Sequence, residues 1–256
     1  MKERDGSRPM VHRKGRQPQR AIVEFLASHY APEIQVNGIE NLREPQLGDK
    51  GDIFVANHRS HADYTIFDQS LKRNDLEEIA KRTIPLSGLR VEGNPIARLL
   101  IPAYNRVLIW SSTVEPRNKR EKKKKFRMDR ETLTYTKWNL GHGYNTLVFP
   151  EGTRSRTGML GQGQPGIVHI FNLVDNVRIV PVAISGTEKI LPPGKLLPKR
   201  GCPTVSFLQP IEVYELNDLS KHIKDKRERQ MYIINFVMSI LVLSLHQEDQ
   251  RVYAKI

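Results

Sequence analysis

The chain has little that could crosslink it or anchor it across a membrane. Its single cysteine, Cys202, excludes an intramolecular disulfide and a cysteine-rich zinc site. The chain therefore either lies in a reducing compartment or needs no disulfide, and a cytosol-facing location is favoured. The longest apolar run, residues 231–245, has 15 residues, fewer than the roughly 20 that cross a bilayer. The charged N-terminus also lacks the apolar core of a secretory signal. We therefore expect no spanning helix, and we expect residues 231–245 to form either a buried C-terminal helix or an interfacial membrane contact.

Positive charge is abundant but concentrated in two segments. Residues 1–20 hold seven Lys/Arg against two acidic residues, and residues 117–130 hold nine against two. The two segments supply twelve of the thirteen net positive charges, so the remaining body is almost neutral. They are either solvated surface or contacts with a polyanion, which would be anionic lipid or nucleic acid.

Nucleic acid is the less favoured of the two polyanions. The sequence has no zinc-finger spacing, no RNP-like aromatic strand and no alternation of basic and aromatic residues; Phe126 alone interrupts the second segment. We therefore expect contact with an anionic membrane surface and no specific nucleic acid partner. The candidate membrane-binding residues are Lys122, Lys123, Lys124 and Lys125.

The remaining pattern predicts a single-domain α/β fold, with a mixed, mostly parallel sheet flanked by helices. No internal repeat or long linker divides the 256 residues. We expect a basic tail and short helix over 1–30, the main domain over 31–215 and a C-terminal helix within 216–256 that starts near Asn217 or Asp218. The expected strands are 52–56, 106–110, 145–149, 178–184 and 204–208; the expected helices are 63–72, 94–101, 119–140 and 166–175; residues 191–203 form a loop.

Polar residues gather where the first expected strand ends, in the sequence NHRSHAD. His58, His61 and Asp63 allow three interpretations: metal ligands, a polar helix cap, or a catalytic pair of His58 and Asp63. Residues five apart fit poorly on one face of a continuous helix. If His58 lies in the turn and Asp63 in the first helical turn, the carboxylate can reach one ring nitrogen and leave the other free to act as a base.

A second polar stretch, PEGTRSRTG, follows the strand at 145–149. Arg154 offers paired donors that suit a phosphate, and Gly152 allows the backbone to approach a ligand closely. Arg156 is a second phosphate-binding candidate. The alternative is a turn that carries a structural ion pair.

Three motifs in this order resemble the glycerolipid acyltransferases. NHRSHAD is similar to the His-four-residues-Asp motif of that family, FPEGTRS to its phosphate-binding motif, and IVPVAI to its fourth motif. The resemblance extends from VNGIENL, near residue 36, to LQPIEV, near residue 213. It implies an acyltransferase-like α/β domain.

The resemblance also implies an activity and roles for particular residues. His58 would deprotonate the acceptor hydroxyl with support from Asp63, and an acyl group would pass directly from acyl-coenzyme A or acyl carrier protein, without a metal or cofactor. The implied product is phosphatidic acid, made by sn-2 acylation of lysophosphatidic acid in phospholipid biosynthesis. The implied head-group contacts are Glu151, Gly152, Thr153 and Arg154, and Pro181 would shape the acyl or thioester side.

The chain departs from the family pattern in two places. The second family motif ends in an arginine, but residues 104–112 have Ser111 there and Arg106 earlier, which makes Arg106 a candidate substitute. The family's bacterial members often begin with a hydrophobic anchor, whereas this N-terminus is basic, so attachment would be peripheral, on the cytoplasmic face of a membrane.

The acceptor remains open at this stage. HRSHADY and RSRTG look like the motif versions of glycerol-3-phosphate and dihydroxyacetone-phosphate acyltransferases, whereas FPEGTR is the lysophosphatidate version. The sn-1 acylation of glycerol-3-phosphate, or acylation of another lysolipid, is therefore the alternative reaction. A non-catalytic basic protein that binds membrane or nucleic acid is the alternative of another class.

Overall fold

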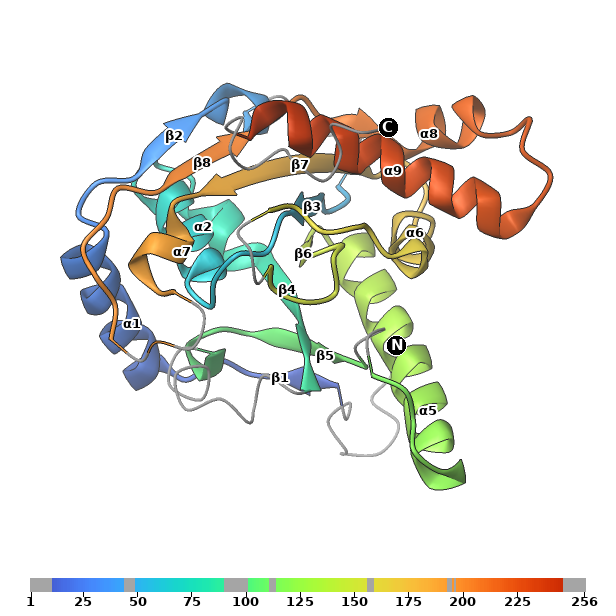
Figure 1. Cartoon of the computed structure of the whole chain (residues 1–256), viewed down its shortest axis with the longest axis horizontal. Helices are drawn as coiled ribbons and strands as arrows, with labels where there is room; N and C mark the ends of the chain where they lie inside the picture. Colours follow the sequence, from blue (N-terminus) through green and yellow to red (C-terminus); the bar gives the residue numbers. More distant parts are fainter. Residues whose placement is uncertain are drawn as a thin grey trace.

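One sheet organises the chain, with five parallel strands at its centre. The computed structural model describes residues 11–43, 49–89, 101–110, 114–155, 159–192, 195 and 197–245, and within these residues the sheet has nine strands (Figure 1). Their order is β1-β5-β4-β6-β3-β7-β8-β2, and β9 pairs with β7. The strands are β1 His12–Arg13, β2 Gln35–Asn37, β3 Ile53–Ala56, β4 Thr83–Gly88, β5 Arg106–Ile109, β6 Asn145–Val148, β7 Arg178–Ser185, β8 Thr204–Phe207 and β9 Ile211–Glu212.

The parallel strands bring distant parts of the sequence to one edge. Within the series β5-β4-β6-β3-β7, each strand is parallel to the next. Outside it, β1 is antiparallel to β5. Both β8 and β9 are antiparallel to β7. The carboxyl ends of β3, β6 and β7 therefore lie side by side. Polar residues that follow these three strands are placed together, as is typical of parallel α/β sheets.

Helices cover both faces of the sheet (Figure 1). α1 and α2 contact each other on one face, and α5, α6 and α9 lie on the other. The helices are α1 Gln17–Tyr30, α2 Asp63–Lys72, α3 Glu77–Arg82, α5 Lys119–Gly141, α6 Val168–Phe171, α7 Thr187–Ile190, α8 Val213–Leu219 and α9 Lys226–Ser244, with shorter 3-10 turns η1 Ile39–Leu42, η3 Ile101–Ala103 and η4 Pro165–Ile167.

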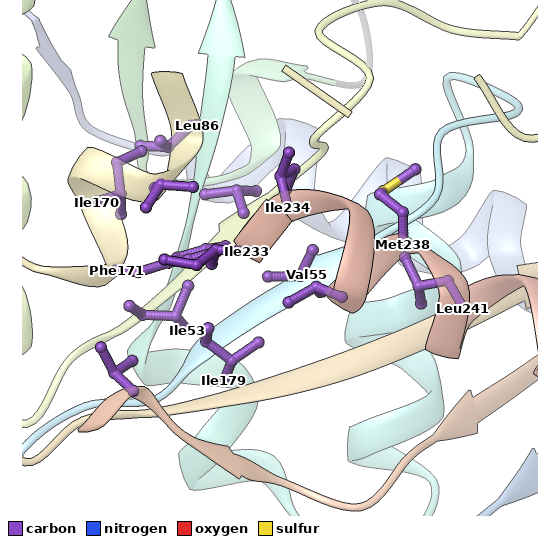
Figure 2. Close-up of a cluster of buried hydrophobic side chains, with 14 of the residues drawn as sticks. Ile53, Val55, Leu86, Ile170, Phe171, Ile179, Ile233, Ile234, Met238 and Leu241 are labelled. Carbon is purple, nitrogen blue, oxygen red and sulfur yellow. The ribbon is translucent and has the colours of Figure 1, made fainter. Parts of the chain in front are cut away.

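β3 shows how alternation along a strand feeds two cores. Phe54 and Ala56 belong to one buried cluster, whereas Ile53 and Val55 belong to the other, because successive side chains point to opposite faces. In the second cluster, Val55 lies near Ile234 and Met238 of α9, and Ile53 lies near Phe171 and Ile179 (Figure 2). Burial of each such side chain contributes about 1.5–3 kcal/mol, and this fixes β3 between two helical layers.

The C-terminal helix is the clearest correction to the sequence-based boundaries. α8 ends at Leu219, and α9 begins at Lys226, so the expected start near Asn217 or Asp218 is wrong. Asp225 caps the new helix, accepting a hydrogen bond from the Glu228 N–H at 2.8 Å. In the part of the chain that the structure describes, α9 and the other helices are too short or too polar to cross a membrane.

The five expected strands are confirmed, and the helices at 63–72 and 119–140 match α2 and α5. Residues 191–203 form a loop where they are described. The helix expected at 166–175 is shorter, because it ends at Phe171, and the positive φ of Asn176 then turns the chain into β7. The helix expected at 94–101 lies outside the described residues, except Ile101 in η3. The expected elements do not include β4, in which Pro85 and Gly88 weaken the strand pattern.

Candidate active site

The turn between β3 and α2 holds His58 against Asp63. Asn57 fixes the start of this turn, because its side chain donates to the Ile184 carbonyl and accepts from the Ile184 N–H, at 2.8 and 2.7 Å. Asp63 is the first residue of α2, and its Oδ2 lies 2.8 Å from His58 Nδ1. The contact predicted between a turn histidine and an aspartate in the first helical turn is confirmed.

Asp63 is completely buried, and hydrogen bonds surround its carboxylate. Oδ2 also accepts from the backbone N–H groups of Arg59 and Ser60, at 2.7 and 2.9 Å. Oδ1 accepts from the Thr187 hydroxyl at 2.5 Å, just after β7. Because carboxylates are favoured at helix N-termini, the first turn of α2 gives further support to this charge. The aspartate is held in one orientation from two strand ends.

This arrangement selects one tautomer of the histidine. Asp63 Oδ2 already accepts from two backbone N–H groups and so acts as an acceptor toward the ring; Nδ1 of His58 then carries the hydrogen and Nε2 keeps its lone pair. The His58 ring stacks on Phe149, which follows β6, with 4.1 Å between ring centroids. The His58 side chain is 20% exposed, whereas that of Asp63 is 0% exposed. A substrate can therefore meet the histidine but not the aspartate.

Glu151 supports the same turn from the end of β6. Its Oε1 accepts from the His58 N–H and its Oε2 from the Gly161 N–H, each at 2.7 Å. Burial raises the pKa of this carboxyl, and the two backbone donors partly offset that rise. A Cβ built on Gly161 would lie 2.8 Å from Oε2, so a larger residue there would push the Glu151 carboxylate out of its present position. Glu151 is 4% exposed, and this geometry favours positioning of His58 over direct contact with a head group.

Arg154 and His61 lie in the electrostatic range of the pair. Burial lowers the pKa of Arg154, and Asp63 opposes that change. Burial, and after it the electrostatic effects of Arg154 and of His58 when that ring is protonated, lower the pKa of His61 to about 4, although Asp63 opposes them. The His61 ring is therefore neutral near pH 7. A backbone hydrogen bond also joins the two polar loops, since the Ser155 N–H donates to the His58 carbonyl at 2.8 Å. Arg154 is half-buried beside the neutral ring of His61 and remains the candidate ligand for an anionic group.

The other sequence-predicted residues vary in their distance from the pair. Gly152 has φ +68°, a turn conformation that glycine adopts readily, and Thr153 is exposed next to it. Pro181 is buried within β7, opposite Val55 of β3. Arg106 is buried at the first position of β5, three strand spacings from β3, or about 14 Å. Arg156 lies outside the described residues.

The described residues offer no additional ligands for a metal site at His58, His61 and Asp63. Among the described residues there is no group of three or more His, Cys, Asp or Glu side chains placed to hold a metal ion. Asp63 uses both carboxylate oxygens in hydrogen bonds to protein donors. Its surroundings are those of a histidine partner.

The sequence of the chain matches one family over most of this fold. The Acyltransferase family matches residues 33–185, which is more than half of the chain and includes His58, Asp63 and Arg154. Thr187 lies just past the end of the match. The chain belongs to this acyltransferase family. The resemblance noted from the motifs is thereby confirmed.

Two relatives extend the comparison. The chain is 26% identical over 163 residues to the chloroplastic 1-acyl-sn-glycerol-3-phosphate acyltransferase LPAT1 of Arabidopsis thaliana, covering 63% of this chain and 38% of that protein. It therefore spans well under half the length of this curated relative. The crystal structure of the 1-acyl-sn-glycerophosphate (LPA) acyltransferase PlsC from Thermotoga maritima has a TM-score of 0.53 at 19% identity, over 89% of this chain and 80% of that chain. That likeness confirms the mixed, mostly parallel α/β fold of this acyltransferase domain.

Three contributors to the site were not expected from the sequence: Thr187, Phe149 and Gly161. Thr187 had a detectable signal, because it closely follows a strand predicted to share an edge with the strand before His58. Gly161 had none, since ten residues separate it from Glu151 and only the folded loop brings its N–H to the carboxylate.

Proposed function

We propose that this acyltransferase moves a fatty acyl group from acyl-coenzyme A or acyl carrier protein to the sn-2 hydroxyl of lysophosphatidic acid. The observation that carries the proposal is the His58–Asp63 hydrogen bond at the edge of a family-typical sheet, beside Arg154. Its product would be phosphatidic acid. The two relatives are named for acylation of the same class of acceptor, which supports this assignment.

The chemistry follows from the free nitrogen of His58. Nε2 takes the proton of the acceptor hydroxyl as the oxygen attacks the thioester carbonyl, while Asp63 stabilises the imidazolium that forms. The tetrahedral intermediate collapses, the C–S bond breaks, and the thiolate recovers the proton from Nε2. An ester and a free thiol result, without an acyl-enzyme, a metal or a cofactor.

Arg154 would hold the acceptor phosphate, because its guanidinium supplies paired charged donors close to the pair. Arg106 would contribute only if the bound acceptor extended toward β5. Pro181 would border the acyl or thioester side. Glycerol-3-phosphate is the second candidate acceptor, since the HRSHADY sequence around His58 resembles the sn-1 relatives.

The decisive experiment measures thiol release with purified protein over a matrix of donors and acceptors. Acyl-coenzyme A and acyl carrier protein thioesters would be offered with lysophosphatidic acid, glycerol-3-phosphate and other lysolipids, and the acylated products identified by mass spectrometry. We expect release that depends on lysophosphatidic acid and is absent in His58→Ala. Preference for glycerol-3-phosphate would move the assignment to sn-1 acylation. If His58→Ala retained full transfer to every acceptor, the proposed mechanism would be wrong.

A further inference from the structure

The first nine residues of α5, residues 119–127, project from the body of the protein. None of them is buried, and the first buried residue of the helix is Met128. At 1.5 Å per residue, the helix extends about 14 Å beyond that last packed position. Figure 1 shows this half of α5 running past the sheet, away from the other helices. We call residues 119–127 the projecting segment.

The charge of the projecting segment is largely uncompensated. It holds seven Lys/Arg and one acidic residue, Glu121. Lys125 pairs with Asp129 at 2.6 Å and Arg127 with Glu131 at 3.6 Å. Lys122, Lys123 and Lys124 form no ion pair with any residue that the structure describes. Like charges four residues apart repel, and cations near a helix N-terminus oppose the helix dipole. Folding alone gives no reason for such a cluster, whereas an anionic partner would relieve both effects.

The projecting segment lies beyond the same sheet edge as the candidate active site. α5 returns to the opposite edge at its end, where the Gly51 N–H, just before β3, donates to the Leu140 carbonyl at 2.9 Å. Further back along the helix, the Thr132 hydroxyl donates to the Leu108 carbonyl at 2.8 Å. Register through β4 and β6 places Leu108 level with Phe149, at the carboxyl edge. Residues before Thr132 therefore extend past the edge at which His58 lies.

We propose that the projecting segment docks on an anionic lipid bilayer and so turns the carboxyl edge of the sheet toward the membrane. Charge complementarity selects an anionic surface, since Lys122, Lys123 and Lys124 are exposed and unpaired within the described chain. Phe126, 72% exposed, supplies an apolar side chain for the interface. The orientation of the site rests on the proposed function, because only a lipid acceptor needs His58 to face the bilayer.

The test compares two triple variants that remove equal charge. Lys122→Gln/Lys123→Gln/Lys124→Gln alters the projecting segment. Lys224→Gln/Lys226→Gln/Arg227→Gln alters exposed residues around the start of α9, near α6 and the amino edge. Both proteins would be sedimented with phosphatidylcholine vesicles that contain about 30% phosphatidylglycerol, in about 0.05 M and about 0.5 M salt. We expect the α5 variant to lose about tenfold or more in vesicle partition, the α9 variant less than about twofold, and wild-type binding to fall at high salt.

A conservative variant separates charge from folding. Lys122→Arg/Lys123→Arg/Lys124→Arg should keep wild-type vesicle binding, and glutamine should leave the helical circular dichroism unchanged because its helix propensity is close to that of lysine. Equal losses in the α5 and α9 variants would assign binding to net charge and overturn the proposal. An α5 variant that loses affinity for duplex DNA but not for vesicles would overturn it too. Vesicle binding needs no turnover, so its outcome is independent of the acyl-transfer test.

Acyl transfer supplies the readout for orientation. The rate with an acceptor embedded in vesicles, divided by the rate with a short-chain monomeric acceptor, should fall in the α5 glutamine variant in proportion to the lost partition. An unchanged ratio in a variant that no longer binds vesicles would show that docking does not present the acceptor.

Discussion

The turn at residues 57–63 and the projecting segment of α5 use charge in opposite ways. In the turn, the carboxylate of Asp63 is completely buried and accepts hydrogen bonds from a ring, two backbone N–H groups and a hydroxyl. In the projecting segment, Lys122, Lys123 and Lys124 are exposed and form no ion pair with any described residue. The first region depends on the position of each atom, whereas the second depends on summed charge. A single substitution in the turn should therefore greatly reduce acyl transfer, whereas a single substitution in the projecting segment should change vesicle binding only slightly.

The largest effect should come from the pair itself, and it should not be additive. His58→Ala and the nearly isosteric Asp63→Asn should each lower kcat by about 10²–10⁴-fold, because one removes the proposed base and the other removes the carboxylate proposed to support its imidazolium. The double variant should be no slower than His58→Ala, as expected of residues that act as a unit. Steady-state thiol release measures all three. If the two fold-decreases in kcat multiplied in the double variant, His58 and Asp63 would act independently and not as a catalytic pair.

A smaller loss is expected at Thr187, which only positions Asp63. Thr187→Val keeps the shape but leaves Oδ1 of a buried carboxylate without its hydroxyl donor, at a cost of about 1–3 kcal/mol. We expect kcat to fall about tenfold with an unchanged KM, and Thr187→Ser to restore it. A Thr187→Ser variant as slow as Thr187→Val would assign the loss to packing of the methyl group instead of the hydrogen bond.

Because of His61, the free energy of unfolding should decrease as the pH falls. Its pKa is about 4 in the folded chain against an ordinary 6.5, so the unfolded chain binds a proton first as pH falls. The folded state therefore loses stability between pH 6.5 and about 4, relative to a variant that cannot titrate there. Urea unfolding across this range should show a flatter profile for His61→Asn than for wild type. Parallel profiles would mean that His61 is as easily protonated in the folded state as in the unfolded chain.

The smallest effect should come from one charge in the projecting segment. Lys123→Gln removes one of seven basic residues from an exposed helix, so vesicle partition should fall by no more than about fivefold. The free energy of unfolding, measured by thermal denaturation, should stay within about 0.5 kcal/mol of the wild-type value, as is usual for exposed substitutions. If this single change abolished vesicle binding, the segment would contain a specific lysine site. Its function would then depend on the position of one residue, as in the turn, and not on summed charge.

The sequence predicted the site where local pattern and chemistry agree. The alternation of apolar strands and helical segments indicated a sheet, and His58 and Asp63 were found because both lie in one short turn after a strand. The helix boundary at α9 was missed because a charged stretch before an apolar run resembles a continuous helix. Only the cap at Asp225 and the turn after Leu219 separate the two helices.

The sequence by itself determined which residues could react, because residue types and their spacing fix the available acids, bases and charges. It also fixed the two basic segments and the family. Tertiary structure decided what each residue meets. It turned Glu151 toward the His58 backbone, brought Thr187 from 124 residues away to Asp63, and set α5 to project past the sheet edge at which His58 lies. These contacts depend on strand order and register, which arise when the whole chain buries its two cores and which no local pattern contains.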